Sequence, residues 1–343
     1  MIYLLKEVVI LKILLYAQGL KVIGKSGLGK AIQHQQKALK YVKVPYTLNL
    51  HDNYDILHIN TYFLKSYFLA KKAKKNGKKI VYHAHSTEED YKDGFIFAKQ
   101  TSKFFKKWLV RCYALGDVII TPTNYSKKLL KGYKGLEDKK IVAISNGIDT
   151  DFFKSNENYK KSFKKRYGYN ENDKIIIGIG LYIRRKGLVD FVELAKRLPE
   201  YKFIWFGKSP LAAATEDVKS AVHTKLNNLK FAGYVEQKLI REALGGCDLY
   251  LFPTLEETEG IPIFEAFAMK CKAIIRDIPI FDELLEDGKI VYKAKDVDQF
   301  ERKIKKILNN QLPDLTNKGY EIAKERDIKN VGKKLKEVYE SLK

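Results

Sequence analysis

The stretch "KILLYAQGLKVIGKSGLGKAIQHQQKAL" (residues 12–39) has the pattern of a strand, a glycine-rich turn and a helix. Its first part is apolar and predicts a buried strand, and its last part predicts a helix. In between, Gly24, Gly27 and Gly29 allow the backbone to approach a ligand closely, and the free amides at a helix start favour an anion. The stretch is either a phosphate-binding loop or a plain tight turn.

The glycines in "GKSGLGKAI" (24–32) nearly spell the phosphate-binding loop of P-loop nucleotidases. That loop needs a hydroxyl side chain after its lysine to hold magnesium, whereas Ala31 stands there. We also find no separate apolar strand that ends in a magnesium-binding aspartate, because in "DVIIT" (117–121) the aspartate comes first. The sequence therefore argues against a P-loop ATPase or GTPase.

Further strand and helix patterns follow along the whole chain. The strand candidates are "KILLYAQ", "ILHIN", "IVYHAHS", "VIITPT" and "IVAISNG" in the first half, and "IIIGIGL", "KFIWFG", "LKFAGYV", "LYLFPT", "KAIIRD" and "IVYK" in the second. Helical stretches lie between them, for example at 61–76, 124–133, 187–198, 236–245 and 299–310. Two successive sets of βα units predict an α/β protein with two doubly wound Rossmann-like domains, whose ligand lies at the carboxyl ends of the strands in a shared cleft.

We expect the domain boundary at the polar stretch "KSNENYKKSFKKRYGYNEND" (154–173). The N-terminal domain would span residues 1–155 and the C-terminal domain residues 156–324. A last helix, at about 325–343, is expected to pack back on the first domain.

The composition excludes several classes of protein. A chain of 343 residues with 45% hydrophobic and 12% aromatic residues is long and apolar enough for two cores, which excludes a disordered chain. No stretch approaches eighteen uncharged apolar residues, so we expect no transmembrane helix. Cys112, Cys247 and Cys271 are scattered, which suits a reducing cytosol, and the six histidines form no Cys/His cluster, so we expect neither a metal site nor a cofactor.

The N-terminal residues "MIYLLKEVVIL" do not form a good signal peptide, because Glu7 interrupts the apolar run and no basic region leads it. The first strand starts directly after Leu11. We expect Leu11 to be the true start and residues 1–10 to be a spurious extension.

The positive charge is large and uneven. The formal net charge is +23, and residues 1–150 carry 27 Lys and Arg against 11 Asp and Glu, whereas the remaining residues carry 37 against 30. This asymmetry predicts a polyanionic partner surface near the first half.

The stretch "LYLFPTLEETEGIPIFEAFA" (249–268) carries the strongest chemical signal. A buried strand ends at Pro253, an acidic loop follows, and a helix begins near Pro262. Glu257 would lie on the loop and Glu265 on the first helical turn, so both would border the free amides of Gly260 and Ile261, which can bind a phosphate. The alternative is that Glu257 is a solvated loop acid and Glu265 merely complements the helix dipole.

Two further stretches favour the ligand-binding interpretation. "GIGLYIRRKG" (178–187) leaves a strand and presents Arg185 and Lys186, which could neutralise a diphosphate. "SNGIDTDFF" (145–153) ends another strand with an Asn-Gly turn beside the domain boundary.

With these motifs, the chain resembles the retaining glycosyltransferases of family 4, which have the two-Rossmann architecture called GT-B. The resemblance rests on the glycine loop, "HAHS" (83–86), "NGID" (146–149), "RRKG" (184–187) and the Glu-x7-Glu pair, in the family's order over about residues 12–300. "GLYIRRKG", "EETEGIPIFEAFA" and "RDIPIF" resemble stretches of short bacterial glycolipid synthases, which add a second α-linked hexose to a monoglycosyl-diacylglycerol.

The resemblance implies a role for each matching residue on a UDP-glucose or UDP-galactose donor. Glu257 would contact the hydroxyls of the donor sugar, and Glu265 the ribose hydroxyls. Arg185 and Lys186 would bind the diphosphate. The helix amides of Gly260 and Ile261 would complete the phosphate site.

Two N-terminal residues match as well. Gly27 would approach the diphosphate, and His85 would lie near the transferred sugar at the end of a strand. The alternative for His85 is a core histidine bonded to backbone. We expect His83, two residues earlier, on the opposite face of the strand.

The chain departs from the family at one place: Leu181 follows Gly180 where many members have arginine. Arg184 or Arg185 would supply this charge from later in the loop. Because the carboxylate needed for a covalent intermediate is not evident, the family's retention of configuration is expected to proceed by front-face return.

The acceptor must be inferred from the basic first half. In "KFFKKWLVRCY" (103–113), the basic residues Lys103, Lys106, Lys107 and Arg111 should share one helical arc, opposite an apolar arc of Phe104, Phe105, Trp108, Leu109 and Cys112. With "KKAKKNGKK" (71–79), this surface predicts peripheral attachment to anionic lipid on the inner face of the cell membrane, in the cytoplasm. A helix that docks its apolar arc on the core is the alternative.

Two other functions remain open. One is a transferase for a soluble capsule or cell-wall polysaccharide acceptor. The other is a nucleic-acid-binding protein, which the charge alone suggests but which leaves the two glutamates unexplained; we expect no nucleic-acid partner.

Overall fold

The computed structural model describes residues 11–19, 24, 26–92 and 97–343. The expected extension, residues 1–10, therefore lies outside the described residues. The chain divides into two compact units. The first contains the chain up to Thr87, Lys106–Gly147 and Ile328–Lys343, and the second contains Glu88–Phe105 and Ile148–Asp327.

A six-stranded parallel sheet forms the centre of the first unit, in the order β2-β1-β3-β4-β5-β6. The strands are β1 (Ile13–Tyr16), β2 (Tyr46–Thr47), β3 (Ile56–Ile59), β4 (Lys79–His83), β5 (Val118–Thr121) and β6 (Ile141–Ala143). The sequence predicted each of these except β2, a two-residue edge strand too short for an apolar pattern. The strand order reverses between β1 and β3, which is where open α/β sheets bind ligands, outside the carboxyl ends.

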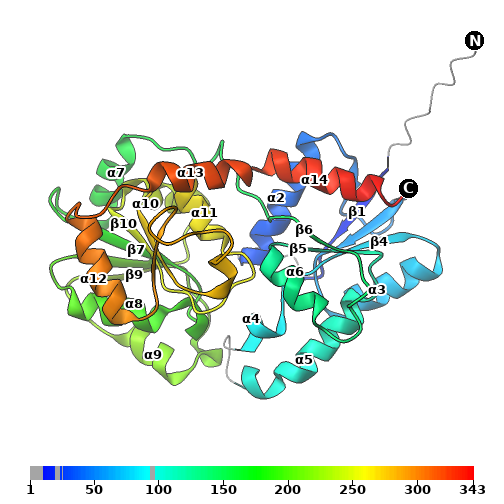
Figure 1. Cartoon of the computed structure of the whole chain (residues 1–343), viewed down its shortest axis with the longest axis horizontal. Helices are drawn as coiled ribbons and strands as arrows, with labels where there is room; N and C mark the ends of the chain where they lie inside the picture. Colours follow the sequence, from blue (N-terminus) through cyan, green and yellow to red (C-terminus); the bar gives the residue numbers. More distant parts are fainter. Residues whose placement is uncertain (1–10, 20–23, 25, 93–96) are drawn as a thin grey trace, which may run out of the picture. The chain divides into compact units, whose positions relative to one another are not determined.

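Helices cover this sheet because each connection between parallel strands must cross over. They are α2 (Gly27–Tyr41), α3 (Leu64–Lys75), α5 (Ala98–Tyr113), α6 (Asn124–Lys131) and α14 (Ile328–Glu340), of which α5 begins in the second unit. The C-terminal helix α14 packs across α2 (Figure 1). A Cβ on Gly332 would stand 2.6 Å from the Ala38 carbonyl oxygen, so this close helix contact requires glycine. Leu335 and Tyr339 of α14 belong to the core of the first unit.

The second unit contains another six-stranded parallel sheet, in the order β12-β11-β10-β7-β8-β9. The strands are β7 (Ile175–Ile179), β8 (Lys202–Phe206), β9 (Leu229–Gly233), β10 (Leu249–Phe252), β11 (Ala273–Arg276) and β12 (Tyr292–Ala294). Counted from β7, this order is 3-2-1-4-5-6, the Rossmann order, and it reverses between β7 and β10. The predicted α/β fold with two Rossmann-like sheets is confirmed.

The helices of the second unit alternate with its strands (Figure 1). They are α4 (Glu88–Lys92), α7 (Asn158–Tyr167), α8 (Leu188–Arg197), α9 (Glu216–His223), α10 (Gln237–Gly246), α11 (Ile261–Ala268), α12 (Val297–Leu308) and α13 (Thr316–Glu325), with the short 3-10 turns η1 (Arg184–Lys186), η2 (Leu211–Ala213) and η3 (Pro279–Phe281). Trp205, Phe191 and Phe203 form the centre of the core, with their rings edge to face.

The chain passes between the two units four times: after Thr87, after Phe105, after Gly147 and after Asp327. Residues 88–105 group with the second unit, although the sequence placed them inside an N-terminal domain. This assignment follows from contacts between distant residues, which a one-dimensional pattern does not contain. Within the described parts of the chain, no helix combines the length and the apolar character that crossing a bilayer requires.

Candidate functional site

The carboxyl ends of β7 and β10 bring the basic and acidic candidates of the second unit together. After β7 the chain forms η1, which carries Arg185 and Lys186, and after β10 it forms the loop that carries Glu257. Lys186 Nζ donates a hydrogen bond to Glu257 Oε1, and Arg185 Nη1 lies 3.8 Å from Glu257 Oε2. Residues predicted from two distant motifs therefore form one cluster at the point where the strand order reverses.

The backbone ties these two loops to each other. The Arg185 carbonyl accepts hydrogen bonds from the Leu255 amide, at 2.7 Å, and from the Thr254 hydroxyl, at 3.0 Å. The same Thr254 hydroxyl oxygen lies 3.2 Å from Glu257 Oε1, so its one hydrogen is shared between the two acceptors. The loops hold the cations and the carboxylate in place before any ligand binds.

Gly187 makes the close approach of these loops possible. Its φ of +73° is in the left-handed region, and a Cβ there would overlap the carbonyl of Pro253 at the end of β10. The glycine of the "RRKG" motif is therefore required by packing, whatever the two preceding residues bind.

Charge neutralisation dominates the electrostatics of the cluster. Burial alone would raise the pKa of Glu257, but Lys186 and Arg185 outweigh burial and hold that pKa below its ordinary range. Glu257 is therefore ionised at neutral pH, even though its side chain is almost completely buried.

A second acid reaches the cluster from α4. Asp90 Oδ1 lies 2.9 Å from Arg185 Nη1, and burial raises the pKa of Asp90 in spite of this cation. Arg184 instead points away, since it is exposed and pairs with Asp217 at 3.2 Å. Of the two arginines proposed to replace the charge missing at Leu181, the structure thus places Arg185 in the cluster and Arg184 outside it.

The start of α11 borders the same loop. Gly260 is the N-cap with a φ of +84°, and Ile261 is the first helical residue, as predicted. Glu265 is fully buried and is the fifth residue of α11, so it lies one position beyond the first turn in which the sequence placed it. Its distance from the N-terminus makes a simple interaction with the helix dipole a poor explanation for burying it.

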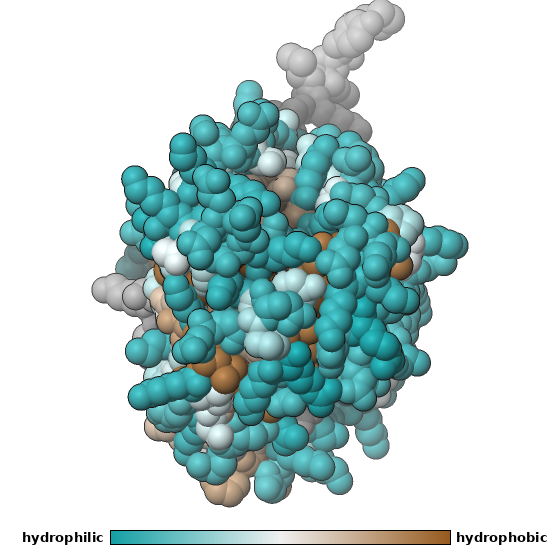
Figure 2. Space-filling model, turned by 90° about the vertical axis from the view of Figure 1, so that its left-hand side faces the viewer, coloured by the Kyte–Doolittle hydropathy of each residue, from teal (hydrophilic) through white to brown (hydrophobic). Residues whose placement is uncertain are grey.

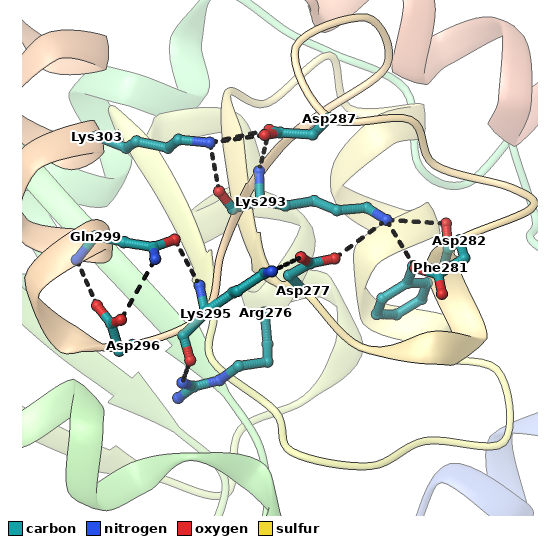
Figure 3. A network of polar contacts seen from close by, with 10 residues as sticks. All are labelled: Arg276, Asp277, Phe281, Asp282, Asp287, Lys293, Lys295, Asp296, Gln299 and Lys303. Carbon is teal, nitrogen blue, oxygen red and sulfur yellow. Dashed lines mark hydrogen bonds and ion pairs between the residues drawn. The ribbon is translucent and has the colours of Figure 1, made fainter.

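A buried lysine, Lys293, contacts the residues around the η3 turn (Figure 3). Lys293 of β12 donates to the Phe281 carbonyl at 3.2 Å and lies 3.6 Å from Asp277 and 3.5 Å from Asp282. The Phe281 ring in turn packs where a Cβ on Gly260 would lie, 3.4 Å away. The network in Figure 3 therefore fixes the η3 turn against the N-cap of α11.

His85 lies in the first unit, just after β4. Its Nε2 is 2.9 Å from Asn60 Oδ1, so its partner is a side chain and not the backbone. The expectation that His83 points to the opposite face is wrong: the rings of His83 and His85 stack with centroids 4.0 Å apart. Alternate residues of a strand point to the same face, and this spacing extends just past the end of β4.

Gly27 is the first residue of α2, and Ser26 caps this helix by accepting a hydrogen bond from the Gly29 amide at 3.3 Å. A Cβ on Gly27 would have no neighbour within 4 Å among the described residues. Packing therefore does not require this glycine. Residues 20–23 and 25 of the loop lie outside the described residues.

The sequence interpretation missed Asn60, Gln35, Thr254 and Asp90. Asn60 directly follows β3, next to β4 in the sheet, so the rule that carboxyl ends meet at one edge pointed to it. Thr254 follows β10 in the same way. Gln35 and Asp90 lie on helices, and only the packing of those helices reveals their positions.

The predicted faces of the helix at 103–113 need a correction. Phe104 is 74% exposed, whereas the sequence placed it on the buried apolar arc. Lys106 lies over the Tyr133 ring, 4.1 Å from its centroid, while Lys103, Lys107 and Arg111 are exposed as expected. Of the predicted apolar arc, Trp108 is the aromatic residue that contacts the chain around α3: it donates to the Tyr62 carbonyl at 2.6 Å, and its ring centroid lies 5.1 Å from that of Tyr67.

Comparisons with known families match both halves of the chain. The family described as "Glycosyl transferases group 1" matches residues 159–326, and "Glycosyltransferase Family 4" matches residues 32–152.

The chain is also similar to named proteins. It is 36% identical over 334 residues to the processive diacylglycerol alpha-glucosyltransferase of Acholeplasma laidlawii, covering 97% of this chain and 98% of that protein. It is 25% identical over 250 residues to the alpha-galactosylglucosyldiacylglycerol synthase of Streptococcus pneumoniae, covering 70% and 65%.

Among solved structures, Anabaena Alr3699/HepE in complex with UDP and glucose has a TM-score of 0.75 at 17% identity, with 96% and 100% of the two chains covered. The sucrose-phosphate synthase of Thermosynechococcus elongatus has a TM-score of 0.72 at 14% identity, with 91% and 77% covered. These two similarities concern the fold.

Proposed function

The chain belongs to glycosyltransferase family 4 and has the GT-B fold, and on that premise we propose that it transfers an α-hexose from UDP-glucose or UDP-galactose to a membrane glycolipid, monoglucosyl-diacylglycerol. The observation that carries the proposal is the cluster of Arg185, Lys186 and Glu257 beside the start of α11. The glycolipid acceptor is suggested by the similarity to the Acholeplasma and Streptococcus enzymes.

The donor would bind at the carboxyl ends of β7 and β10. Its diphosphate would meet Arg185, Lys186 and the amides of Gly260 and Ile261, which offer charge and free N–H groups at one place. Glu265 would accept hydrogen bonds from the ribose hydroxyls. Glu257 would accept them from the sugar, since it is kept ionised and can only act as an acceptor.

The chemical step requires stabilisation of the departing UDP. Negative charge grows on the diphosphate as the glycosidic bond breaks, and Arg185, Lys186 and the α11 amides are positioned before the reaction to offset it. We propose that the enzyme needs no metal for this step and that it retains the anomeric configuration by front-face return. From the first unit, His85 would contact the sugar and Gly27 would contact the diphosphate.

The glycolipid acceptor lies in the membrane, and the basic first unit would attach the protein peripherally to the cytoplasmic face of that membrane. Leu64 and Phe68 of α3 are each more than 60% exposed, and exposed lysines flank them. By contrast, the face of the molecule in Figure 2 is covered mainly by hydrophilic residues. An apolar anchor among basic side chains suits an anionic lipid surface.

The direct test is incubation with radiolabelled UDP-hexoses and monoglucosyl-diacylglycerol in anionic vesicles, in the presence and absence of a chelator. We expect label in a diglycosyl lipid from one of the two donors, with an α linkage and no loss of activity on chelation. Transfer to a capsule or cell-wall polysaccharide, with no lipid product, would replace the glycolipid acceptor by a soluble one. Duplex DNA binding without nucleotide-sugar affinity would contradict the enzyme proposal as a whole.

A further inference from the structure

A continuous chain of buried polar side chains connects the C-terminal helix with the histidine that follows β4. The members of this polar chain, in order of contact, are Tyr339, His58, His83, Gln35, Asn60 and His85. All of them lie in the first unit, and all except His85 are at least nine-tenths buried. Only His85 has a part in the proposed transfer.

The three histidines of the polar chain are neutral at pH 7. Burial lowers the pKa of His58 and of His85 to about 3, and it lowers the pKa of His83 well below its ordinary range. The rings of His83 and His85 stack with centroids 4.0 Å apart, and the rings of His58 and His83 are nearly parallel with centroids 5.4 Å apart. A neutral imidazole has one N–H and one lone pair, so a hydrogen bond at one nitrogen decides what the other can do.

Tyr339 sets the direction of these hydrogen bonds. Its hydroxyl oxygen lies 2.6 Å from His58 Nδ1, a distance typical of an O–H donor and short for an N–H donor. His58 Nδ1 is then the acceptor, and the ring carries its hydrogen on Nε2. This nitrogen donates to His83 Nδ1, 3.2 Å away.

The same direction continues through two amides. Because His83 Nδ1 accepts, Gln35 must present its Nε2 there, at 2.9 Å, and the same nitrogen donates to Asn60 Oδ1, at 2.8 Å. Asn60 Oδ1 also accepts from His85 Nε2, at 2.9 Å. His85 Nδ1 is left with its lone pair and with no hydrogen-bond partner among the described residues.

We propose that Tyr339 is a positioning residue for the transfer reaction: through the polar chain it holds His85 as the Nε2–H tautomer, so that His85 Nδ1 accepts a hydrogen bond from a substrate hydroxyl. The role on a substrate rests on the proposed function, whereas the tautomer is a property of the protein alone. If the side-chain amides of Gln35 and Asn60 were both flipped, each hydrogen bond of the polar chain would run in the opposite direction. His85 would then carry its hydrogen on Nδ1, and this nitrogen could not accept a hydrogen bond.

The polar chain also contains polar atoms that are unsatisfied. Gln35 Oε1, Asn60 Nδ2 and His83 Nε2 are buried without a partner in the part of the chain that the structure describes. Unpaired buried groups are costly, and a purely structural network would be expected to pair them. They are consistent with a network organised around the nitrogen that it presents to a ligand.

The first experiment measures the ring nitrogens of His85 by long-range ¹H–¹⁵N NMR on the full chain without substrate, with the resonances assigned by a His85→Gln variant. We expect Nε2 in the protonated range and Nδ1 in the unprotonated range. The opposite pattern would overturn the proposal, whether or not the protein transfers a hexose.

The second experiment removes the hydroxyl that sets the direction. In Tyr339→Phe, of nearly the same shape, we expect the two His85 nitrogen shifts to move toward an average of both tautomers. Tyr82→Phe is the matched control: it removes another buried hydroxyl of this unit, which donates to the Thr61 carbonyl at 2.8 Å, and should leave the His85 shifts unchanged. Unchanged His85 shifts in Tyr339→Phe would refute the positioning role.

A second variant keeps the test independent of Tyr339. Gln35→Met breaks the link between His83 and Asn60 without changing the size of the side chain, and it should have the same effect on the His85 nitrogens. In both variants we expect kcat for hexose transfer to fall by about a factor of two, in proportion to the share of His85 that remains the Nε2–H tautomer, at unchanged UDP affinity. A full wild-type kcat together with an altered tautomer would show that the tautomer does not serve the reaction.

Discussion

Glu265 and Lys186 should each contribute to UDP binding, whereas Glu257 should not. In Glu265→Gln and Lys186→Met, a buried polar or charged group of the nucleotide loses its partner, which costs about 1–3 kcal/mol. In Glu257→Gln, Lys186 loses the carboxylate that it now contacts and remains available to the diphosphate. Calorimetry with UDP should therefore show weaker binding for the first two variants and nearly unchanged binding for the third.

Turnover separates these roles further. Glu257→Gln should lower kcat, because Glu257 would contact only the sugar. If Glu257→Gln loses as much UDP affinity as Glu265→Gln, the roles of the two glutamates are exchanged. Unchanged UDP affinity in all three variants would contradict the nucleotide site itself.

Gly187→Ala should destabilise the second unit by clearly more than 1 kcal/mol. The substitution adds left-handed backbone strain, about 1–2 kcal/mol, to an overlap with the Pro253 carbonyl. Gly168→Ala is the matched control, because its φ is +66° and its Cβ would have open space, so that it adds the strain alone. Urea unfolding of both variants measures the difference, and equal losses would mean that the loops after β7 and β10 can move apart freely.

At the scale of an element, α5 should contact the membrane. Reversing Lys103 and Lys107 to Glu should weaken sedimentation with anionic vesicles, since each basic group near such a surface contributes about 1 kcal/mol. UDP affinity and the far-UV circular dichroism should stay unchanged, because neither lysine belongs to the cluster of Arg185, Lys186 and Glu257. The loss should shrink as salt rises, since exposed charges are screened over about 8 Å at physiological ionic strength.

A charge-matched control is available on the second unit. Lys225 and Lys318 are exposed, and reversing both changes the net charge by the same amount. If this control loses as much vesicle binding as the α5 variant, the attraction is a property of the total charge and not of α5. Phe104→Asp tests the apolar part of the contact, and it should also reduce binding.

The elements differ in how far the sequence predicts them. The eleven strand candidates all proved to be strands, because most buried parallel strands contain an apolar run that is visible in a short window, as in Ile175–Ile179 and Val118–Thr121. The edge strand β2 contains two residues and has no such run. Phe104 was predicted on the buried arc of α5 and is exposed, whereas Trp108 of the same arc packs on Tyr67 of α3.

At the scale of the whole molecule, the buried histidines should make the protein sensitive to mild acid. His58, His83 and His85 have folded-state pKa values far below the ordinary 6.5, so the unfolded chain binds these protons first. Their neutral state favours folding fully above about pH 6.5, and this contribution is lost as the pH falls toward about 3. Each histidine should contribute at most about 1.4 kcal/mol per pH unit to the slope of the free energy of unfolding against pH.

Urea unfolding between pH 6.5 and 5 measures this slope, in a range where carboxylates contribute little. In His58→Asn the slope should fall by the contribution of one proton. A free energy of unfolding that stays constant over this range in the wild type would contradict the burial of neutral histidines.

The sequence by itself determined the two Rossmann-like sheets, the family and the candidate residues Glu257, Glu265, Arg185 and Lys186, because strand periodicity and short motifs are local properties of the chain. Tertiary structure alone decided which arginine joins the cluster, with Arg185 beside Glu257 and Arg184 paired with Asp217. It also decided that Tyr339 reaches His58 across 281 positions of sequence. Such contacts arise when helices pack on a sheet, and the packing energy is shared among residues that no sequence window brings together.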